Sequence, residues 1–153
     1  MNIKILVTNR KAHFQYEILQ TYEAGIELEG TEVKSLRESH INIAESYCRV
    51  SDQMEIFLMN ANISPYKFGN IHNHEPLRER RLLLHKSEIR RLYGRVKEKG
   101  LTLIPLKLYL KKGRIKIEIG LAKGKKIHDK RETLKRQDAD REIARNIKYN
   151  DHE

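Results

Sequence analysis

The sequence is poor in cysteine and lacks any long hydrophobic run. Cys48 is the only cysteine among 153 residues, so the chain can form neither an intrachain disulfide nor a cysteine-based metal cluster. No apolar stretch approaches the roughly 20 residues that cross a bilayer. Residues 1–7 are too short for the apolar segment of a signal peptide and have no small-residue cleavage site. These absences favour a cytoplasmic protein with no membrane partner.

The motifs of common catalytic sites are also missing. The chain has no Gly-x-Ser-x-Gly elbow, and Cys48 lies among apolar neighbours in a predicted strand, which favours a buried structural role. The glycines around Gly120 lack the spacing of a phosphate-binding loop, and Lys126 stands where that loop needs serine or threonine. His72 and His74 form only a His-x-His pair, and loop histidines are more often solvated than metal-bound. We therefore predict a protein that is not an enzyme and needs no metal or other cofactor.

Positive charge, by contrast, is abundant and unevenly placed. The formal net charge is +10, and residues 78–99 hold nine Lys or Arg against three Asp or Glu. Residues 107–131 hold ten against two, whereas residues 1–77 are net negative. Such clustering favours a polyanionic partner. Residues 78–81 are predicted to join the second basic block in one surface patch. Residues 120–131 combine lysines with glycines and a histidine, which suits RNA because lysine neutralises phosphate and a ring can stack on a base.

Alternating apolar residues predict several antiparallel strands. The clearest hairpin joins residues 101–110 to residues 114–119 and has one apolar and one basic face, the latter including Tyr109. A second hairpin is predicted where residues 47–50 and 54–59 flank a short polar loop. Further extended segments are predicted at residues 16–22, 26–28 and 82–84, with a bend at residues 23–25. A carboxylate at that bend, on Glu23, could accept hydrogen bonds from a base edge or a 2′-hydroxyl.

Two amphipathic segments predict helices, with Thr31 and Ser87 as their N-caps. Residues 61–77 contain prolines, glycine and histidines, and are predicted to form a long, irregular and flexible connection. Several short strands and one packed helix favour a mainly β fold with α (α+β). The expected architecture is an oligonucleotide-binding-type antiparallel β-barrel of five or six strands with short helices and a basic C-terminal tail. An α+β sandwich is the competing architecture.

The pattern weakens after Arg131. Apolar residues are sparse there among dense charge, and isolated helices of this length are marginal in water. We therefore expect an RNA-binding barrel domain over residues 1–122. A tail over residues 123–153 is expected to be disordered when free and helical on a surface.

The order of several motifs resembles one known family. The motifs occupy residues 9–12, 23–37, 65–66, 69–70, 73–74, 80–86, 106–109 and 120–132. Together they cover nearly the whole chain, and on them the chain resembles the small protein B family, the SsrA-binding proteins of bacterial trans-translation. The Glu-Ala-Gly, Glu-Val-Lys-Ser-Leu-Arg and Gly-Lys-Lys motifs are highly specific in combination.

The resemblance implies an oligonucleotide-binding-type barrel that binds the tRNA-like domain of tmRNA (SsrA RNA) and has no enzymatic activity. It implies delivery of alanyl-tmRNA, with elongation factor Tu, to ribosomes stalled without a stop codon. Alanyl-tRNA synthetase would be an indirect partner, and small-subunit ribosomal RNA a direct one. The tail would enter the empty mRNA channel and the decoding centre and become helical there.

The resemblance also implies site residues. Glu23 would be a hydrogen-bond acceptor, Leu83 a support for the binding surface, and Lys116 a phosphate contact. The full set implied for tmRNA binding is Asn9, Arg10, Lys11, Glu23, Leu83 and Lys116. The set implied for the decoding centre is Gly124, Lys125, Lys126, His128, Asp129, Lys130 and Arg131, with His128 stacking on a ribosomal base.

Two departures from the family pattern stand out. The chain has His13-Phe14-Gln15-Tyr16 where the family often has Arg-His-Asp/Glu-Tyr, and Glu38-Ser39 replaces a common glycine turn. A ribosome-associated barrel protein or general RNA chaperone is the second hypothesis for function. An RNA-processing nuclease ranks last, because it would need a metal or acid/base constellation.

Overall fold

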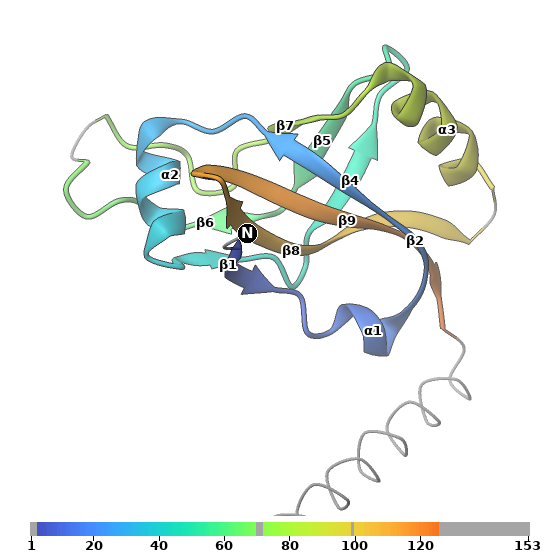
Figure 1. Ribbon diagram of the computed structural model, residues 1–153, viewed down its shortest axis with the longest axis horizontal. Coiled ribbons are helices and arrows are strands. Elements are labelled where there is room, and N and C mark those ends of the chain that lie inside the picture. The colour runs from blue at the N-terminus through green and yellow to red at the C-terminus, as the bar shows by residue number, and fades with distance from the viewer. Residues whose placement is uncertain (1–2, 70–71, 99, 126–153) are drawn as a thin grey trace, which may run out of the picture.

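The computed structural model describes residues 3–69, 72–98 and 100–125 of the chain. Strands dominate this part, and the helices are short (Figure 1). This composition confirms the prediction of a mainly β fold with α. The elements, in chain order, are β1 (Ile3–Thr8), α1 (Ala12–Gln15), β2 (Tyr16–Ile26), α2 (Gly30–Arg37), β3 (Ile41–Asn42), β4 (Tyr47–Val50), β5 (Ile56–Met59), β6 (Asn62–Ile63), β7 (Arg80–Leu83), α3 (Lys86–Val96), β8 (Leu101–Lys111) and β9 (Arg114–Gly124).

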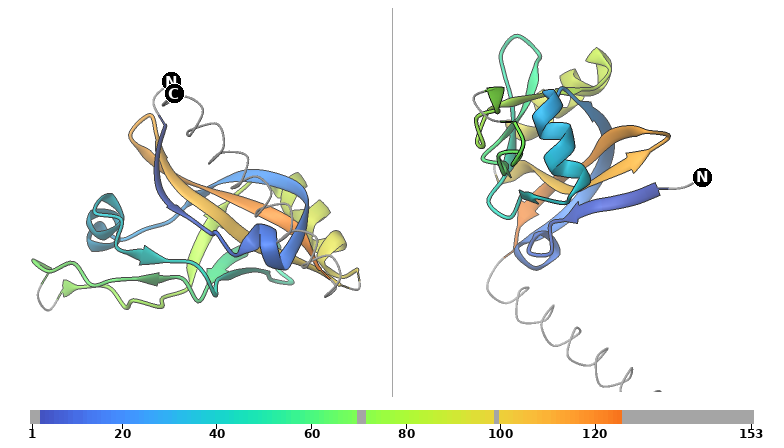
Figure 2. Two further views of the ribbon diagram at one scale, coloured as in Figure 1. Left: turned by 90° about the horizontal axis from the view of Figure 1, so that it is seen from below. Right: turned by 90° about the vertical axis from the view of Figure 1, so that its left-hand side faces the viewer.

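Six of the strands close on themselves. Hydrogen bonds link β8, β4, β5, β7, β2 and β9 in that order, and β9 pairs again with β8. The pairings are antiparallel, and β1 adds a further strand alongside β8. Two further views show β2, β8 and β9 curving around the interior (Figure 2). This closure confirms the predicted oligonucleotide-binding-type barrel, because a sandwich would leave two separate sheets.

The longest hairpin joins β8 to β9, as predicted. Lys111 lies opposite Arg114, and Lys112 and Gly113 between them have φ values of 52° and 75°. A two-residue turn with positive φ at both positions matches the twist of the flanking strands, and glycine adopts that conformation without steric cost. The pairing then runs the whole length of both strands, and β9 ends at Gly124 rather than at the predicted Ile119.

The pairing between β4 and β8 is the shortest described in the barrel. It consists of one residue pair, Cys48 opposite Leu103. Helix α3 contacts both strands, and its apolar residues Ile89 and Leu92 are buried. The helix therefore covers the weakest seam. Cys48 is buried there, as predicted, and burial raises the pKa of its thiol to about 12.

The interior of the barrel holds one main apolar cluster, to which almost every strand and both longer helices contribute. Its most deeply buried side chains are Leu36, Ile43, Ile56, Leu58, Ile63, Leu82, Leu92, Leu103, Leu108, Ile117, Ile119 and Leu121. Alternation places these residues inward and their neighbours outward, so the outer faces of β2, β7, β8 and β9 are free to carry polar groups.

Two predictions about segments that contain glycine, residues 23–25 and residues 120–131, were wrong. Residues 23–25 form no bend, because β2 pairs with β9 continuously through Glu23, Ala24 and Gly25. Gly120 does not lie on a surface for RNA, because it is buried in β9. A Cβ added at Gly120 would lie 3.1 Å from Leu106 and 3.2 Å from Ile18. Glycine is needed there for close packing within the barrel.

Helix α2 starts one residue before the predicted N-cap, Thr31. The N–H of Glu29 donates to Glu32 Oε1 at 2.8 Å, and the hydroxyl of Thr31 instead contacts His74 Nδ1 at 2.8 Å. Helix α3 likewise starts earlier than predicted, with His85 rather than Ser87 at the N-cap. Both local predictions failed because an earlier extended residue, Glu29 or His85, occupies the N-cap position.

Candidate RNA-binding groove

A groove on the outer face of the barrel brings three predicted site residues together. Lys116 on β9 lies opposite Gly25 on β2, and Gly25 lies opposite Leu83 on β7. Residues directly opposite one another point to the same side of a sheet, so Lys116 and Leu83 flank the bare backbone of Gly25. Glu23 lies two residues before Gly25 on the same face. The groove has a volume of about 510 Å³ and opens to solvent.

Gly25 forms the floor of this groove. A Cβ added there would lie 3.3 Å from the Cβ of Leu83, which is tight contact. Leu83 itself is 47% exposed, unusual for a leucine in a strand whose neighbour Leu82 is fully buried. The groove therefore pairs an exposed apolar side chain with accessible backbone, and sequence reasoning missed Gly25 because only strand register reveals the close approach.

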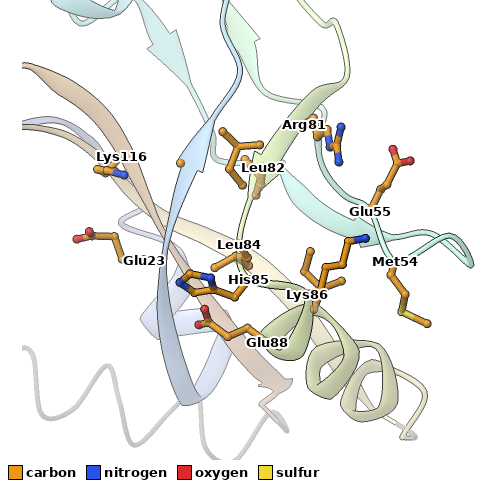
Figure 3. A pocket seen from close by; sticks show the side chains of 13 residues that line it. Glu23, Met54, Glu55, Arg81, Leu82, Leu84, His85, Lys86, Glu88 and Lys116 are labelled. Carbon is orange, nitrogen blue, oxygen red and sulfur yellow. The ribbon is translucent and has the colours of Figure 1, made fainter.

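The far wall of the groove comes from the start of α3. Figure 3 shows Glu23 and Lys116 to one side and His85, Lys86 and Glu88 toward the other. Arg81 lines the same groove from β7 and is exposed. Three cations, Lys116, Arg81 and Lys86, thus line the groove from three separate elements and can contact phosphates, and three carboxylates, Glu23, Glu55 and Glu88, stand among them.

Glu23 is already engaged within the protein. Its carboxylate accepts a hydrogen bond from the Tyr109 hydroxyl, and Lys111 Nζ lies 3.3 Å from each of its oxygens. The hydrogen bond from Tyr109 is the main cause that lowers the pKa of Glu23, outweighing burial, and the charges of Lys111 and Lys116 add to it. Burial and the same contact raise the pKa of Tyr109. Glu23 is therefore an ionised, oriented acceptor at neutral pH.

Lys116 has no comparable partner. Among the described residues it makes no salt bridge, whereas Lys107 pairs with Glu118 at 3.2 Å and Lys111 with Glu23 at 3.3 Å. Of the lysines on this face of the β8–β9 hairpin, Lys116 is the one whose charge remains available to an external anion.

The predicted residues 9–11 lie elsewhere. Asn9 is buried, donates from Nδ2 to the Pro105 carbonyl at 3.0 Å, and links the end of β1 to β8. Arg10 and Lys11 are exposed and line a separate hollow beside residues 41–44. Lys11 lies 3.7 Å from Glu45. The structure therefore brings Glu23, Leu83 and Lys116 into one groove and places Asn9, Arg10 and Lys11 outside it.

The end of β9 lies beside α1. Gly124 pairs with Tyr16, the N–H of Lys125 donates to the Gln15 carbonyl at 3.0 Å, and Lys125 Nζ donates to the His13 carbonyl at 2.8 Å. The remaining residues predicted for the decoding centre, Lys126, His128, Asp129, Lys130 and Arg131, lie outside the described residues.

The predicted basic patch at residues 78–81 is wrong for two of its three arginines. Arg80 is completely buried, and its Nε donates to Glu32 at 2.5 Å. Arg78 donates to the other oxygen of Glu32, also at 2.5 Å. Arg80 also donates to the carbonyls of Ala61, Glu75 and Pro76. We call Glu32, Arg78 and Arg80 the buried ion cluster, and only Arg81 from this segment reaches the groove.

The histidines within the described ranges form no metal site. No group of three or more His, Cys, Asp or Glu suited to a metal occurs among residues 3–69, 72–98 and 100–125. His74 is buried rather than solvated, contrary to prediction, and its ring bridges Thr31 Oγ1 and the Ile63 carbonyl at 2.8 Å each. Within the described part of the chain, no helix has the length and apolarity needed to cross a membrane.

Comparison with known proteins gives one consistent family. A family model described as SmpB protein matches residues 6–149. The SsrA-binding protein of Caldicellulosiruptor saccharolyticus is 57% identical over 147 residues, covering 96% of this chain and 92% of that protein. That of Thermosynechococcus vestitus is 55% identical over 148 residues, covering 96% and 97%. A solved chain from "tmRNA-SmpB: a journey to the center of the bacterial ribosome" is similar with a TM-score of 0.67 and 52% identity, covering 79% of this chain and 85% of that one.

Proposed function

The chain belongs to the SmpB protein family, and we propose that it binds the tRNA-like domain of tmRNA through its outer groove. In this proposal it delivers tmRNA to stalled ribosomes in the cytoplasm for trans-translation and acts as a binding protein, not an enzyme. The observation that carries the proposal is the convergence of Glu23, Leu83 and Lys116, far apart in sequence, on one solvent-facing groove.

The groove suits RNA on three grounds. Lys116 offers a cation without a salt-bridge partner among the described residues, which fits a backbone phosphate. Leu83 and Gly25 offer an apolar surface and open backbone against which a base or ribose can pack. Glu23 offers an acceptor for a 2′-hydroxyl or a base amino group, which distinguishes RNA from a simple polyanion.

Glu23 plays two roles in this proposal. Its contacts with Tyr109 and Lys111 orient the carboxylate before RNA arrives, and an oxygen atom with two lone-pair positions can accept a further hydrogen bond. Preorganisation of this kind lowers the entropic cost of binding. Tyr109 is therefore a positioning residue for the groove.

Arg10 and Lys11 extend the proposed RNA contact beyond the groove. Both are exposed, whereas Asn9 is buried and anchors the segment to β8. We propose that Asn9 positions its two neighbours and that they contact tmRNA directly.

The second part of the proposal concerns the ribosome. In this proposal the tmRNA-binding barrel covers residues 1–122, with β9 continuing to Gly124, and the tail that follows within residues 123–153 occupies the empty mRNA channel and becomes helical. In this scheme Gly124, Lys125, Lys126, His128, Asp129, Lys130 and Arg131 contact the decoding centre. Elongation factor Tu accompanies the complex, and alanyl-tRNA synthetase acts on the same RNA. The anchoring of Lys125 beside α1 supports a defined point of departure for the tail.

The proposed function is tested by comparing two RNAs. The affinity of the full-length protein for tmRNA and for an unrelated structured RNA of equal length is measured at physiological salt. Phosphate contacts alone are blind to sequence, so a specific site should favour tmRNA by at least tenfold. Equal affinities would support the general RNA chaperone instead.

Truncation separates the two parts. A chain ending after Lys125 keeps the contacts with Gln15 and His13 and removes the remaining tail. We expect near-normal tmRNA affinity together with loss of peptide tagging on stalled ribosomes in a reconstituted translation assay. A large loss of tmRNA affinity would place part of the primary site in the tail.

A further inference from the structure

We propose that the loop at residues 64–69 presents a second RNA-binding surface, a stacking platform for one unpaired base built from Phe68 and Tyr66. The choice of RNA as partner rests on the proposed function. The loop projects beyond α2, at the end of the molecule opposite α3 (Figures 1 and 2). It is therefore separate from the groove and from the end of β9.

The platform consists of two rings and two lysines. Phe68 is 67% exposed, the highest value among the large apolar side chains that protrude from the described surface. The rings of Tyr66 and Phe68 meet edge to face, with centroids 5.5 Å apart. Lys34 Nζ lies 5.3 Å from the centroid of Tyr66, and Lys67 Nζ lies 5.1 Å from that of Phe68.

The backbone beneath the platform is held firmly. Asn73 Oδ1 accepts from the N–H of Tyr66 at 3.0 Å, Asn73 Nδ2 donates to the Tyr66 carbonyl, and the N–H of Gly69 donates to the same carbonyl at 2.9 Å. A Cβ at Gly69 would lie only 2.6 Å from Asn73 Nδ2, so this turn needs glycine. Residues 66–69 therefore form a hydrogen-bonded turn within the irregular connection predicted for residues 61–77.

A second set of bonds fixes the loop to α2. Ser35 Oγ donates to the Ser64 carbonyl at 2.7 Å. His74 bridges Thr31 and the Ile63 carbonyl from the other side of the loop. Ser35 and His74 are themselves buried, and together with Asn73 they hold the backbone on both sides of the exposed Phe68.

The chemistry of the platform favours RNA over a protein partner. Phe68 is the one large hydrophobic side chain of residues 64–69 that is exposed, and a protein interface of ordinary stability needs about 1,200 Å² of buried surface. One aromatic face, in contrast, suffices for one base. Among the described residues Lys34 and Lys67 make no salt bridge, so either lysine can move from its ring to a phosphate beside the stacked base.

Two RNAs can supply such a base, tmRNA and ribosomal RNA, and photocrosslinking distinguishes them. Phe68 is replaced by p-benzoyl-phenylalanine in the full-length protein, which is irradiated with tmRNA alone, with ribosomes alone, and with both. We expect a crosslink to a defined nucleotide, and the arm in which it forms identifies the source. Crosslinks to ribosomal protein only, or RNA yields no higher than with the same substitution at exposed Leu77, would overturn the proposal.

Affinity measurements complete the test. Phe68→Leu should weaken binding to the crosslinked RNA about tenfold, the order expected for loss of one base–aromatic stack. Tyr47→Leu is the matched control, because Tyr47 is an exposed aromatic on β4, and it should change affinity less than twofold. An unchanged affinity for both RNAs in a folded Phe68→Leu protein would overturn the platform.

A reference variant keeps the two proposals apart. Lys116→Glu tests the groove in the same assays. If Lys116→Glu weakens tmRNA binding and Phe68→Leu changes nothing, the platform fails and the groove stands. If Phe68→Leu weakens binding and Lys116→Glu does not, the groove fails and the platform stands.

Discussion

Two clusters of charged residues in this protein lie on opposite sides of the barrel wall. The buried ion cluster joins Glu32 of α2 to Arg78 and Arg80, and two of its three side chains have no exposed surface. The groove presents Lys116 and Glu23 to solvent. Similar residue types thus have different roles. A buried charge destabilises the fold unless it is paired, whereas an exposed charge remains available to a ligand. We expect changes in the first cluster to alter stability and changes in the second to alter RNA affinity.

Removal of the buried carboxylate should have the largest effect. Glu32→Gln leaves the charge of Arg80 buried without its anion, and loss of one partner of a buried ion pair costs about 3–5 kcal/mol. Urea unfolding followed by circular dichroism measures the loss. Glu118→Gln, in the half-exposed pair with Lys107, is the matched control and should cost less than about 1 kcal/mol. Equal costs for the two variants would contradict the distinction.

Charge reversal in the groove should act on binding alone. Lys116→Glu is expected to weaken tmRNA affinity at least about tenfold and to reduce its salt dependence, because one phosphate contact is lost. Its unfolding free energy should change by less than about 0.5 kcal/mol, as for most surface substitutions. Lys112→Glu in the exposed β8–β9 turn makes the same change in net charge. A similar loss of affinity there would indicate a general charge effect.

Lowering the pH should reveal how much the buried ion cluster contributes to stability, in a measurement that needs no RNA. Burial raises the pKa of Glu32, but hydrogen bonds from Arg78, from the Glu29 N–H and from Arg80 outweigh it, so the pKa lies below its ordinary value of 4.5. A carboxyl with a lowered pKa in the folded state stabilises the fold above the unfolded pKa and loses that contribution as pH falls through the folded pKa. Wild type should therefore lose stability below about pH 4.5 more steeply than Glu32→Gln. Parallel pH profiles of unfolding would argue against this source of stability.

A substitution at the end of α2 should stabilise the fold slightly, in contrast to the destabilising change at Glu32. Ser39 has a φ of 60°, and the N–H groups of Ser39 and His40 donate to the last carbonyls of the helix. Glycine adopts this conformation freely, so Ser39→Gly should stabilise the fold by about 0.5–1 kcal/mol, with RNA affinity unchanged. Thermal unfolding measures the gain. A destabilised variant would show that the serine hydroxyl matters more than the backbone conformation.

The sequence predicted β2, β4, β5, β7, β8 and β9 in outline, because apolar residues recur in them, whereas β1, β3, β6 and α1 were not predicted. The β8–β9 and β4–β5 hairpins, helix α3 and the barrel architecture followed from alternation and turn residues. The helix N-caps were less predictable, since Thr31 is drawn to His74, a partner 43 positions away. The groove was anticipated through Glu23, Leu83 and Lys116, whereas Gly25, Tyr109 and the platform at residues 64–69 were missed.

Composition, periodicity and motif order by themselves determined the chemical class of partner, the β-rich barrel and the family. They did so because charge and alternation are local properties of the chain. Only the tertiary structure decided which charges remain available. Arg78 and Arg80 stand four and two positions from Leu82 in a basic run, yet both pair with Glu32, and strand register also points Arg80 inward. Lys116 points outward through the alternation of β9, but it keeps no salt bridge among the described residues because Lys107 pairs with Glu118 and Lys111 with Glu23. That choice depends on contacts between distant segments, which no local pattern encodes.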